Sequence, residues 1–159
     1  MDNEIKTSAE LAEDAQLPRA HVVHADPNAP ASSEQKPLPD SVKRKPVETK
    51  SPAEWAYQRL ILYIQNFEEQ LDSDEEVAMG FTGGSVGIMR IEGMGYFDPD
   101  IITFYGTQPD GSRSQMIQHV SQLNVMLQAM PKENGREEPN RIGFRLAADL
   151  AEETESEDT

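Results

Sequence analysis

At Ser51 the sequence changes from a proline-rich segment without periodicity to the pattern of an amphipathic helix. Seven prolines lie between Leu17 and Pro52, and few large apolar residues accompany them. Such a segment cannot bury enough apolar surface to offset its ordering entropy, so we interpret residues 1–50 as a disordered N-terminal arm. The run Ser51-Pro52-Ala53-Glu54 has the residues of a capping box, with proline at the first helical position. A compact domain is therefore predicted to begin at Ser51.

The predicted first helix runs from Ser51 to about Leu71, because apolar residues recur there with helical spacing. Its broad apolar face comprises Ala53, Ala56, Tyr57, Leu60, Ile61, Tyr63, Ile64, Phe67 and Leu71. Trp55 and Leu62 lie seven residues apart on the opposite, polar side of the helix. Because aromatic anchors are enriched at protein interfaces, Trp55 and Leu62 are predicted to contact a partner or a second copy. Cover by the chain's own C-terminal tail is the alternative.

Beyond the acidic run 72–76, apolar residues alternate with a period of two, which predicts short antiparallel strands. The expected strands are 77–82, 86–92, 101–105, 114–120 and 142–146, while residues 123–130 fit a strand and a helix equally well. Glycines at positions 80, 87, 93 and 95 indicate tight curvature. The expected fold is α+β, with an N-terminal helix packed on a small, strongly curved antiparallel sheet or barrel of about five strands. Residues 51–147 form this domain, and residues 148–159 form a disordered acidic tail.

Charge excludes several classes of partner. The formal net charge is −15, divided as −2 over residues 1–50, −8 over 51–131 and −5 over 132–159. Since polyanion affinity comes largely from cationic contacts, generic nucleic-acid binding and attachment to an anionic membrane are disfavoured. The longest apolar run is too short to cross a bilayer, and the acidic N-terminus predicts no signal peptide. We therefore expect a cytoplasmic protein, in keeping with the absence of cysteine.

Each motif that could support catalysis or metal binding lacks residues or neighbouring elements that its function requires. Gly83-Gly84-Ser85-Val86-Gly87 matches the nucleophile elbow of hydrolases, but a strand follows where that elbow needs a helix, so a hairpin turn is favoured. Asp72, Asp74 and Glu76 begin like a calcium loop that lacks its glycine and its final glutamate, which leaves a weak cation site open. His119 is the single histidine of the predicted domain, which disfavours a zinc centre. The sequence thus predicts no enzyme, no cofactor and no metal centre.

Two resemblances extend this interpretation. The segments 51–60, 77–84 and 95–100 resemble those of an uncharacterised bacterial domain family of unknown function, over residues 51 to about 147. The run Ser114-Gln115-Met116-Ile117-Gln118-His119 is similar to the strand before the RNA-binding turn of the Hfq members of the Sm-like fold. Ile117 and Gln118 stand where Hfq proteins carry basic and aromatic residues. The second resemblance implies a ring-forming barrel with Tyr105, Gln115 and His119 nearest a ligand.

Two functional hypotheses follow. The first is a non-enzymatic protein-interaction or assembly module that associates with itself or docks a partner through Trp55, Leu62 and an exposed edge strand. The alternative is an Sm-like ring that binds a small nucleotide or a short RNA at Tyr105, Gln115 and His119, where base stacking would act against the unfavourable charge.

Overall fold

A computed structural model of the chain describes residues 19–43, 45, 49–81, 87–132 and 137–157. The chain divides into two compact units, residues 1–50 and residues 51–159. The first unit contains a short 3₁₀ turn, η1 (Ser33–Gln35), and a one-turn helix, α2 (Asp40–Lys43). The disorder predicted for residues 1–50 stays a prediction, and residues 1–18 lie outside the described part of the chain.

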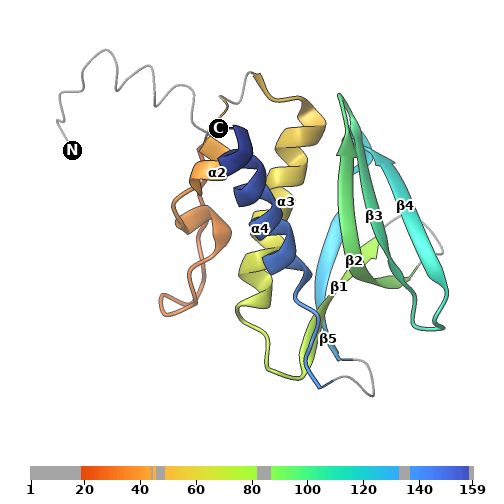
Figure 1. Cartoon of the computed structure of the whole chain (residues 1–159). Helices are drawn as coiled ribbons and strands as arrows, with labels where there is room; N and C mark the ends of the chain where they lie inside the picture. The colour runs from red at the N-terminus through yellow and green to blue at the C-terminus, as the bar shows by residue number, and fades with distance from the viewer. Residues whose placement is uncertain (1–18, 44, 46–48, 82–86, 133–136, 158–159) are drawn as a thin grey trace, which may run out of the picture. The chain divides into compact units, whose positions relative to one another are not determined.

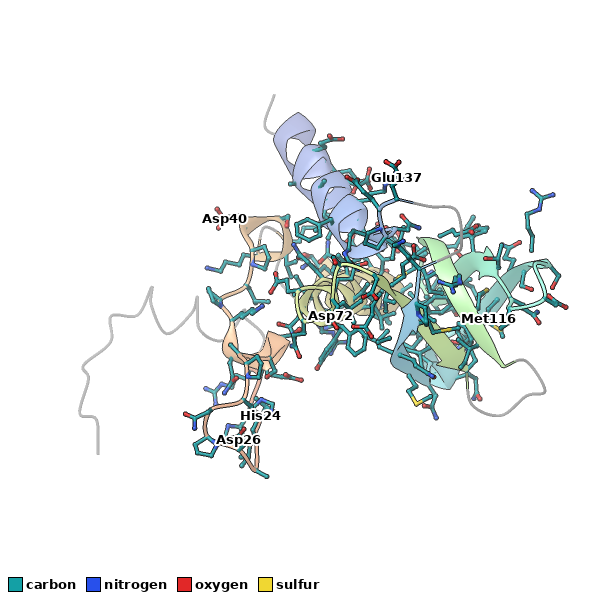
Figure 2. The ribbon with its side chains drawn as sticks, turned by 90° about the horizontal axis from the view of Figure 1, so that it is seen from below. His24, Asp26, Asp40, Asp72, Met116 and Glu137 are labelled. Atoms are coloured by element: carbon teal, nitrogen blue, oxygen red, sulfur yellow. The ribbon has the colours of Figure 1, made fainter. Side chains whose placement is uncertain are left out.

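The second unit is a five-stranded antiparallel sheet with two helices on one face (Figure 1). In chain order its elements are α3 (Pro52–Glu68), β1 (Glu75–Phe81), β2 (Ile88–Phe97), β3 (Ile101–Thr107), β4 (Arg113–His119), the 3₁₀ turn η3 (Val120–Gln122), β5 (Val125–Pro131) and α4 (Ile142–Glu157). The strand order is β4-β3-β2-β1-β5, and every pairing is antiparallel. The view from below again shows α3 and α4 on the same side of the sheet (Figure 2).

Helix α3 begins where the capping residues predict. The Ser51 Oγ accepts a hydrogen bond from the Glu54 N–H at 3.0 Å, which satisfies one of the donors that a helix start leaves unpaired. The same hydroxyl donates to the carboxylate of Asp98, and the Ala53 N–H donates to the Pro99 carbonyl at 3.0 Å. The start of the helix is thus fixed to the turn between β2 and β3.

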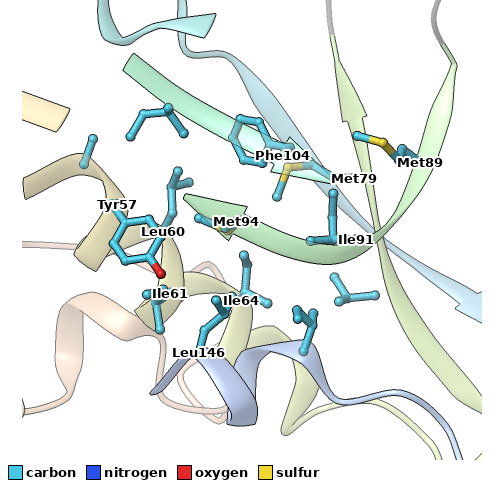
Figure 3. Packing of buried hydrophobic residues seen from close by; sticks show 14 of the residues in the cluster. Tyr57, Leu60, Ile61, Ile64, Met79, Met89, Ile91, Met94, Phe104 and Leu146 are labelled. Carbon is cyan, nitrogen blue, oxygen red and sulfur yellow. The ribbon is translucent and has the colours of Figure 1, made fainter. Parts of the chain in front are cut away.

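The hydrophobic core lies between the helices and the sheet (Figure 3). From α3 it takes Ala53, Ala56, Tyr57, Leu60, Ile61 and Ile64; from the strands Val77, Met79, Phe81, Met89, Ile91, Met94, Ile102 and Phe104; and from α4 Ile142, Leu146 and Leu150. The Phe81 and Phe104 rings meet edge to face, with centroids 5.2 Å apart. The apolar face predicted for the first helix is therefore the face that packs on the sheet.

The prediction of an α+β domain with a five-stranded antiparallel sheet is confirmed, but the expected strong curvature or barrel is wrong. The sheet is open, because β4 and β5 stand at opposite ends of the strand order and do not pair. Instead, the strand glycines lie where the neighbouring strand comes too close to leave room for a side chain. A Cβ on Gly106 would lie 1.9 Å from the Arg90 carbonyl oxygen, and one on Gly95 would lie 2.8 Å from the Thr103 hydroxyl oxygen. Without a closed barrel, the structural basis of the Sm-like prediction is absent.

The C-terminal segment also differs from the prediction. Residues 142–146 are not a strand, and the segment predicted as a tail continues the same helix, α4, to Glu157. Ile142, Leu146 and Leu150 are buried at intervals of four, which is the spacing of one helix face, whereas Phe144 is exposed. Residues 123–130, which the pattern left open, contain strand β5, and it pairs with β1 over its whole length.

The start of α4 is held by polar contacts from α3 and β1. The Gly143 N–H donates to the Glu68 Oε1 at 2.9 Å, and Arg141 donates to the carbonyls of Glu75 and Asp72 at 2.6 and 3.0 Å. Burial raises the pKa of the Glu68 carboxyl, and its backbone hydrogen bonds and the charge of Arg141 offset part of that rise. Within the described ranges, no helix is long and apolar enough to span a membrane.

Candidate functional site

The sheet face turned away from α3 and α4, here called the open face, is the most distinctive surface of the second unit. The strand register places its residues in rows across β4, β3 and β2: His119–Ile101–Phe97, Ile117–Thr103–Gly95 and Gln115–Tyr105–Gly93. Further along the sheet, the rows across β2, β1 and β5 are Arg90–Ala78–Gln128 and Ile88–Gly80–Met126. Alternate residues of these strands, such as Phe104 and Met116, point to the core instead.

Large apolar side chains on the open face are exposed. The exposed fractions are 76% for Phe97, 45% for Tyr105, 62% for Ile117 and 55% for Met126. Phe97, Tyr105 and Ile117 lie in adjoining rows of β2, β3 and β4, whereas Met126 lies in the row of Ile88, nine residues along β2 from Phe97. Single exposed apolar residues are ordinary, but three in adjoining rows form a patch of the kind that marks interaction sites.

Glycines keep this face flat. A Cβ on Gly93 would lie 3.6 Å from the Cβ and Cδ2 of Tyr105, so the tyrosine rests directly on the backbone of β2. A Cβ on Gly80 would lie 3.2 Å from the terminal methyl carbon of Met126, which covers β1 in the same way. Side chains that lie against bare backbone give a low, even surface, the shape on which another sheet packs at a spacing of about 10 Å.

The open face carries charges of both signs. Its strands contribute Arg90, Arg113 and Glu76. Glu92 accepts from the Thr107 hydroxyl at 3.3 Å, and the Asp100 carboxylate lies against His119. Arg90 and Glu76 form an ion pair at 3.0 Å, and the buried Glu76 carboxylate also accepts from the Asn140 N–H at 2.8 Å. Pairing with Glu76 neutralises Arg90, so Arg113, Glu92 and Asp100 are the charged groups of the face that solvent reaches.

Tyr105, Gln115 and His119, which the sequence suggested as ligand-binding residues, all lie on the open face. Tyr105 and Gln115 are direct cross-strand partners, and His119 lies four residues beyond Gln115 on β4. Alternation along the strand places Ile117 on the same face as Gln115 and His119, but sequence reasoning gave no binding role to Phe97, Ile117 or Met126.

Trp55 and Leu62 do not belong to this surface. Both are half-buried on α3, on the other side of the sheet. The Arg59 guanidinium carbon lies 4.7 Å from the centroid of the Trp55 ring, and Trp55 and Leu62 each take part in further interactions within the chain. Their predicted role in binding a partner stays a prediction, and the structure does not bring them together with the open-face residues.

His119 joins Asp100 and Ser121 in an array with the order of a catalytic triad. Its Nδ1 accepts from the Ser121 N–H at 3.1 Å and lies 2.7 Å from the Ser121 Oγ, while Nε2 lies 3.1 Å from the Asp100 carboxylate. An acyl-transfer site also needs N–H donors aimed at an oxyanion. The Ser121 N–H is engaged with His119, and the Val120 N–H donates to the Asp100 carbonyl at 2.7 Å. The array therefore acts as the cap that joins β4 to η3.

The other motifs weighed from the sequence gain no further support. The Ser85 elbow falls in residues 82–86, outside the described part of the chain. In the acidic run, the Asp72 N–H donates to the Glu75 carboxylate at 3.0 Å, and the Glu76 carboxylate pairs with Arg90. The described residues contain no group of three potential metal-binding side chains.

Comparison with known protein families places the chain in a family. A family model described as a family of unknown function, DUF6173, matches residues 45–145, a range that includes α3 and all five strands. No curated protein and no solved structure matches the chain. The match agrees with the sequence resemblance to an uncharacterised domain family, and no resemblance to Sm-like or Hfq proteins accompanies it.

Proposed function

We propose that this chain, which belongs to the family of unknown function DUF6173, is a non-enzymatic protein-interaction module that binds through the open face of its sheet. One observation carries the proposal: Phe97, Tyr105 and Ile117 are exposed in adjoining rows on the sheet face that α3 and α4 do not cover. Sheets are stable when each apolar face is packed against another layer. The helices α3 and α4 cover one face only, so a partner would supply the second layer.

The chemistry of the polar groups supports a binding role over catalysis. The Val120 and Ser121 N–H groups beside the His119 array are both engaged in hydrogen bonds, and other polar residues of the open face, such as Thr103, Gln115 and Gln128, lie in rows across the strands. Flat apolar surfaces with a few polar groups are typical of protein interfaces. Small-molecule sites are instead concave.

Site-specific photo-crosslinking in the producing cell tests the proposal. A photoreactive phenylalanine analogue replaces Ile117 on the open face or, as a matched control, the exposed Gln70 that follows α3. We expect discrete protein adducts from position 117, none from position 70, and loss of the adducts when Tyr105→Glu is added. Equal yields at both positions would overturn the proposal, because an interaction surface must discriminate between them.

A further inference from the structure

We infer that two copies of this chain pair through the edges of their β4 strands, antiparallel about a twofold axis, and so join two five-stranded sheets into one. This inference goes beyond the proposed function, because it concerns an edge of the sheet and not its open face. It rests on the peptide groups that β4 leaves unpaired, on the contrast with the other edge strand, and on two side-chain contacts that the pairing completes.

The bonds at the two ends of the β3–β4 hairpin show which peptide groups of β4 point outward. The Gln108 N–H donates to the Ser112 carbonyl at 2.9 Å, and the Val120 N–H donates to the Asp100 carbonyl at 2.7 Å. Because hydrogen-bonded pairs alternate along an antiparallel ladder, the even-numbered residues of β4 bond to β3 and the odd-numbered residues point outward. Within the described ranges, no other segment takes up the outward N–H and C=O groups of residues 115 and 117.

The other edge strand, β5, is blocked at one end. The Lys132 N–H donates to the Asp74 carbonyl at 2.7 Å, so the same alternation turns the odd-numbered residues of β5 outward. One of them is Pro131, which has no N–H and whose carbonyl already accepts from the Arg90 guanidinium at 2.7 Å. Proline, lysine and bulges are among the features that protect edges from strand addition, and β4 has none of them. The edge of β4 is therefore the one open to another strand.

A second β4 strand fits this edge along its whole length. In the register that pairs all seven residues, Met116 faces Met116 of the second copy, and Gln115 faces Ile117. The outward peptide groups of Gln115 and Ile117 then form hydrogen-bonded pairs, with about four backbone hydrogen bonds at the centre of the interface. A twofold axis makes each contact occur twice.

The charges at the ends of β4 fit the same register. Position 113 of one copy faces position 119 of the other, so the exposed Arg113 lies beside His119 and Asp100 of the second copy. The Asp100 carboxylate, 41% exposed, lies 3.1 Å from the His119 Nε2. Arg113 and Asp100 carry opposite charges, and complementary charges of this kind fix the register of an interface.

Two incompletely used hydrogen-bonding groups also meet in this register. The buried Gln118 Oε1 has no hydrogen-bond partner among the described residues. The Ser114 Oγ accepts from the Gln108 Nε2 at 2.7 Å, which leaves its own hydrogen available to donate. Ser114 of one copy faces Gln118 of the other in a non-hydrogen-bonded pair, the kind in which side chains lie closest. The pairing thus offers the buried oxygen the donor that it lacks within one chain.

The helices leave room for this arrangement. The main contacts of α3 with the sheet are to β1, β2 and β3, and those of α4 are to β2. With the twofold axis normal to the sheet, both pairs of helices lie on one side and both open faces lie on the other. Strand pairing therefore sets two copies of the proposed binding surface side by side.

Sedimentation equilibrium of the full chain, from about 1 to about 200 µM, tests the inference with two charge reversals. Arg113→Glu and Asp100→Lys each bring like charges together at both ends of the interface, so each variant alone should dimerise at least about tenfold more weakly than the wild type. An equimolar mixture should recover the dimer, because the new carboxylate of one chain then faces the new ammonium of the other. Positions 113 and 100 lie at opposite ends of the β3–β4 hairpin, so this recovery cannot arise within one chain.

Introduced cysteines test the register, because the chain has no cysteine of its own. At the twofold axis, the Cα atoms of the two Met116 residues should lie about 4.5 Å apart, within reach of a disulfide. The matched control is Gln115, which is more exposed than Met116 but faces Ile117. On mild oxidation, Met116→Cys should form linked dimers severalfold faster than Gln115→Cys, whereas random collision would favour the more exposed position.

Three results would overturn the inference: a wild type that stays monomeric at about 200 µM, a mixture that dimerises no better than the separate variants, and faster linking of Gln115→Cys than of Met116→Cys. These results are distinct from failure of the proposed function. A monomeric chain that still forms adducts with another protein from position 117, and not from position 70, would refute the strand pairing and leave the interaction module standing.

Discussion

The contrast between two neighbouring residues of α4 tests how the C-terminal segment packs. Leu146 belongs to the core beside α3 (Figure 3) and is 8% exposed, whereas Phe144, two residues earlier, is 54% exposed. Leu146→Ala removes three carbons, a transfer loss of about 2.4 kcal/mol at about 0.8 kcal/mol per methylene. The cavity left behind adds to this loss, so the free energy of unfolding should fall by about 3 kcal/mol. Phe144→Ala should lower it by less than about 1 kcal/mol.

Urea unfolding of the full chain, followed by far-ultraviolet circular dichroism, measures both changes, provided that the slope of free energy against denaturant is unchanged. The pair discriminates between two folds of the same residues. In a strand, Phe144 and Leu146 would share a face and both substitutions would cost similar amounts. Equal losses, or a loss below about 1 kcal/mol for Leu146→Ala, would refute the helical packing of α4.

Three further predictions concern buried groups. A Cβ on Gly143 would lie 2.9 Å from the backbone nitrogen of Gln65, so Gly143→Ala should destabilise the chain by about 1–3 kcal/mol in the same urea assay. Because burial raises the pKa of Glu68, its folded form binds a proton more tightly than its unfolded form, and the stability from this group is lost as pH rises from about 4.5. Glu68→Gln should therefore gain stability relative to the wild type between pH 4.5 and 7, and a constant difference would contradict this. Burial and nearby carboxylates raise the pKa of Tyr57 and Tyr96 to about 12, so an ultraviolet absorbance titration should show two tyrosines ionising near pH 12, with stability falling as pH passes from 10 to 12. Ionisation of all four tyrosines near pH 10 would contradict it.

The sequence correctly predicts those helices and strands for which the apolar periodicity and the capping or turn residues indicate the same structure. Ser51 and Pro52 mark the start of α3, and its apolar face is the face that packs on the sheet. The alternation that predicted strands at 77–82, 101–105 and 114–120 corresponds to β1, β3 and β4 within a few residues. In each of these cases, periodicity and flanking turn residues indicate the same structure.

Prediction of α4 failed because the five residues 142–146 are too few to distinguish the two-residue period of a strand from the 3.6-residue period of a helix. Ile142, Phe144 and Leu146 alternate like a strand, and the apolar residue that decides for a helix is Leu150, which lies among acids. Leu150 is buried together with Leu146, whereas Asp149, Glu152 and Glu153 are exposed, so these acids lie on the outer side of an amphipathic helix. Tertiary packing against α3 decides between the two readings, and single-segment patterns do not contain that information.

The open face could be predicted only in part. Strand β3 has apolar residues on both sides, with Ile102 and Phe104 in the core and Ile101 and Tyr105 opposite, so its sequence does not tell which side the helices cover. The curvature of the sheet was overestimated because a glycine in a strand fits a bend and a close contact equally well. The strand glycines were interpreted as bends, whereas Gly93 and Gly80 lie beneath Tyr105 and Met126.

Hydroxyl-radical footprinting of the chain in the producing cell and of the purified chain tests the central claim most directly. In the purified chain, Phe97, Ile117 and Phe144 should all be labelled, because all three side chains are exposed. In the cell, labelling of Phe97 and Ile117 should fall severalfold, while Phe144, which lies on α4, keeps its rate and serves as the internal reference. Equal labelling of Phe97 and Ile117 in the two samples, or a fall only in step with Phe144, would contradict binding through the open face.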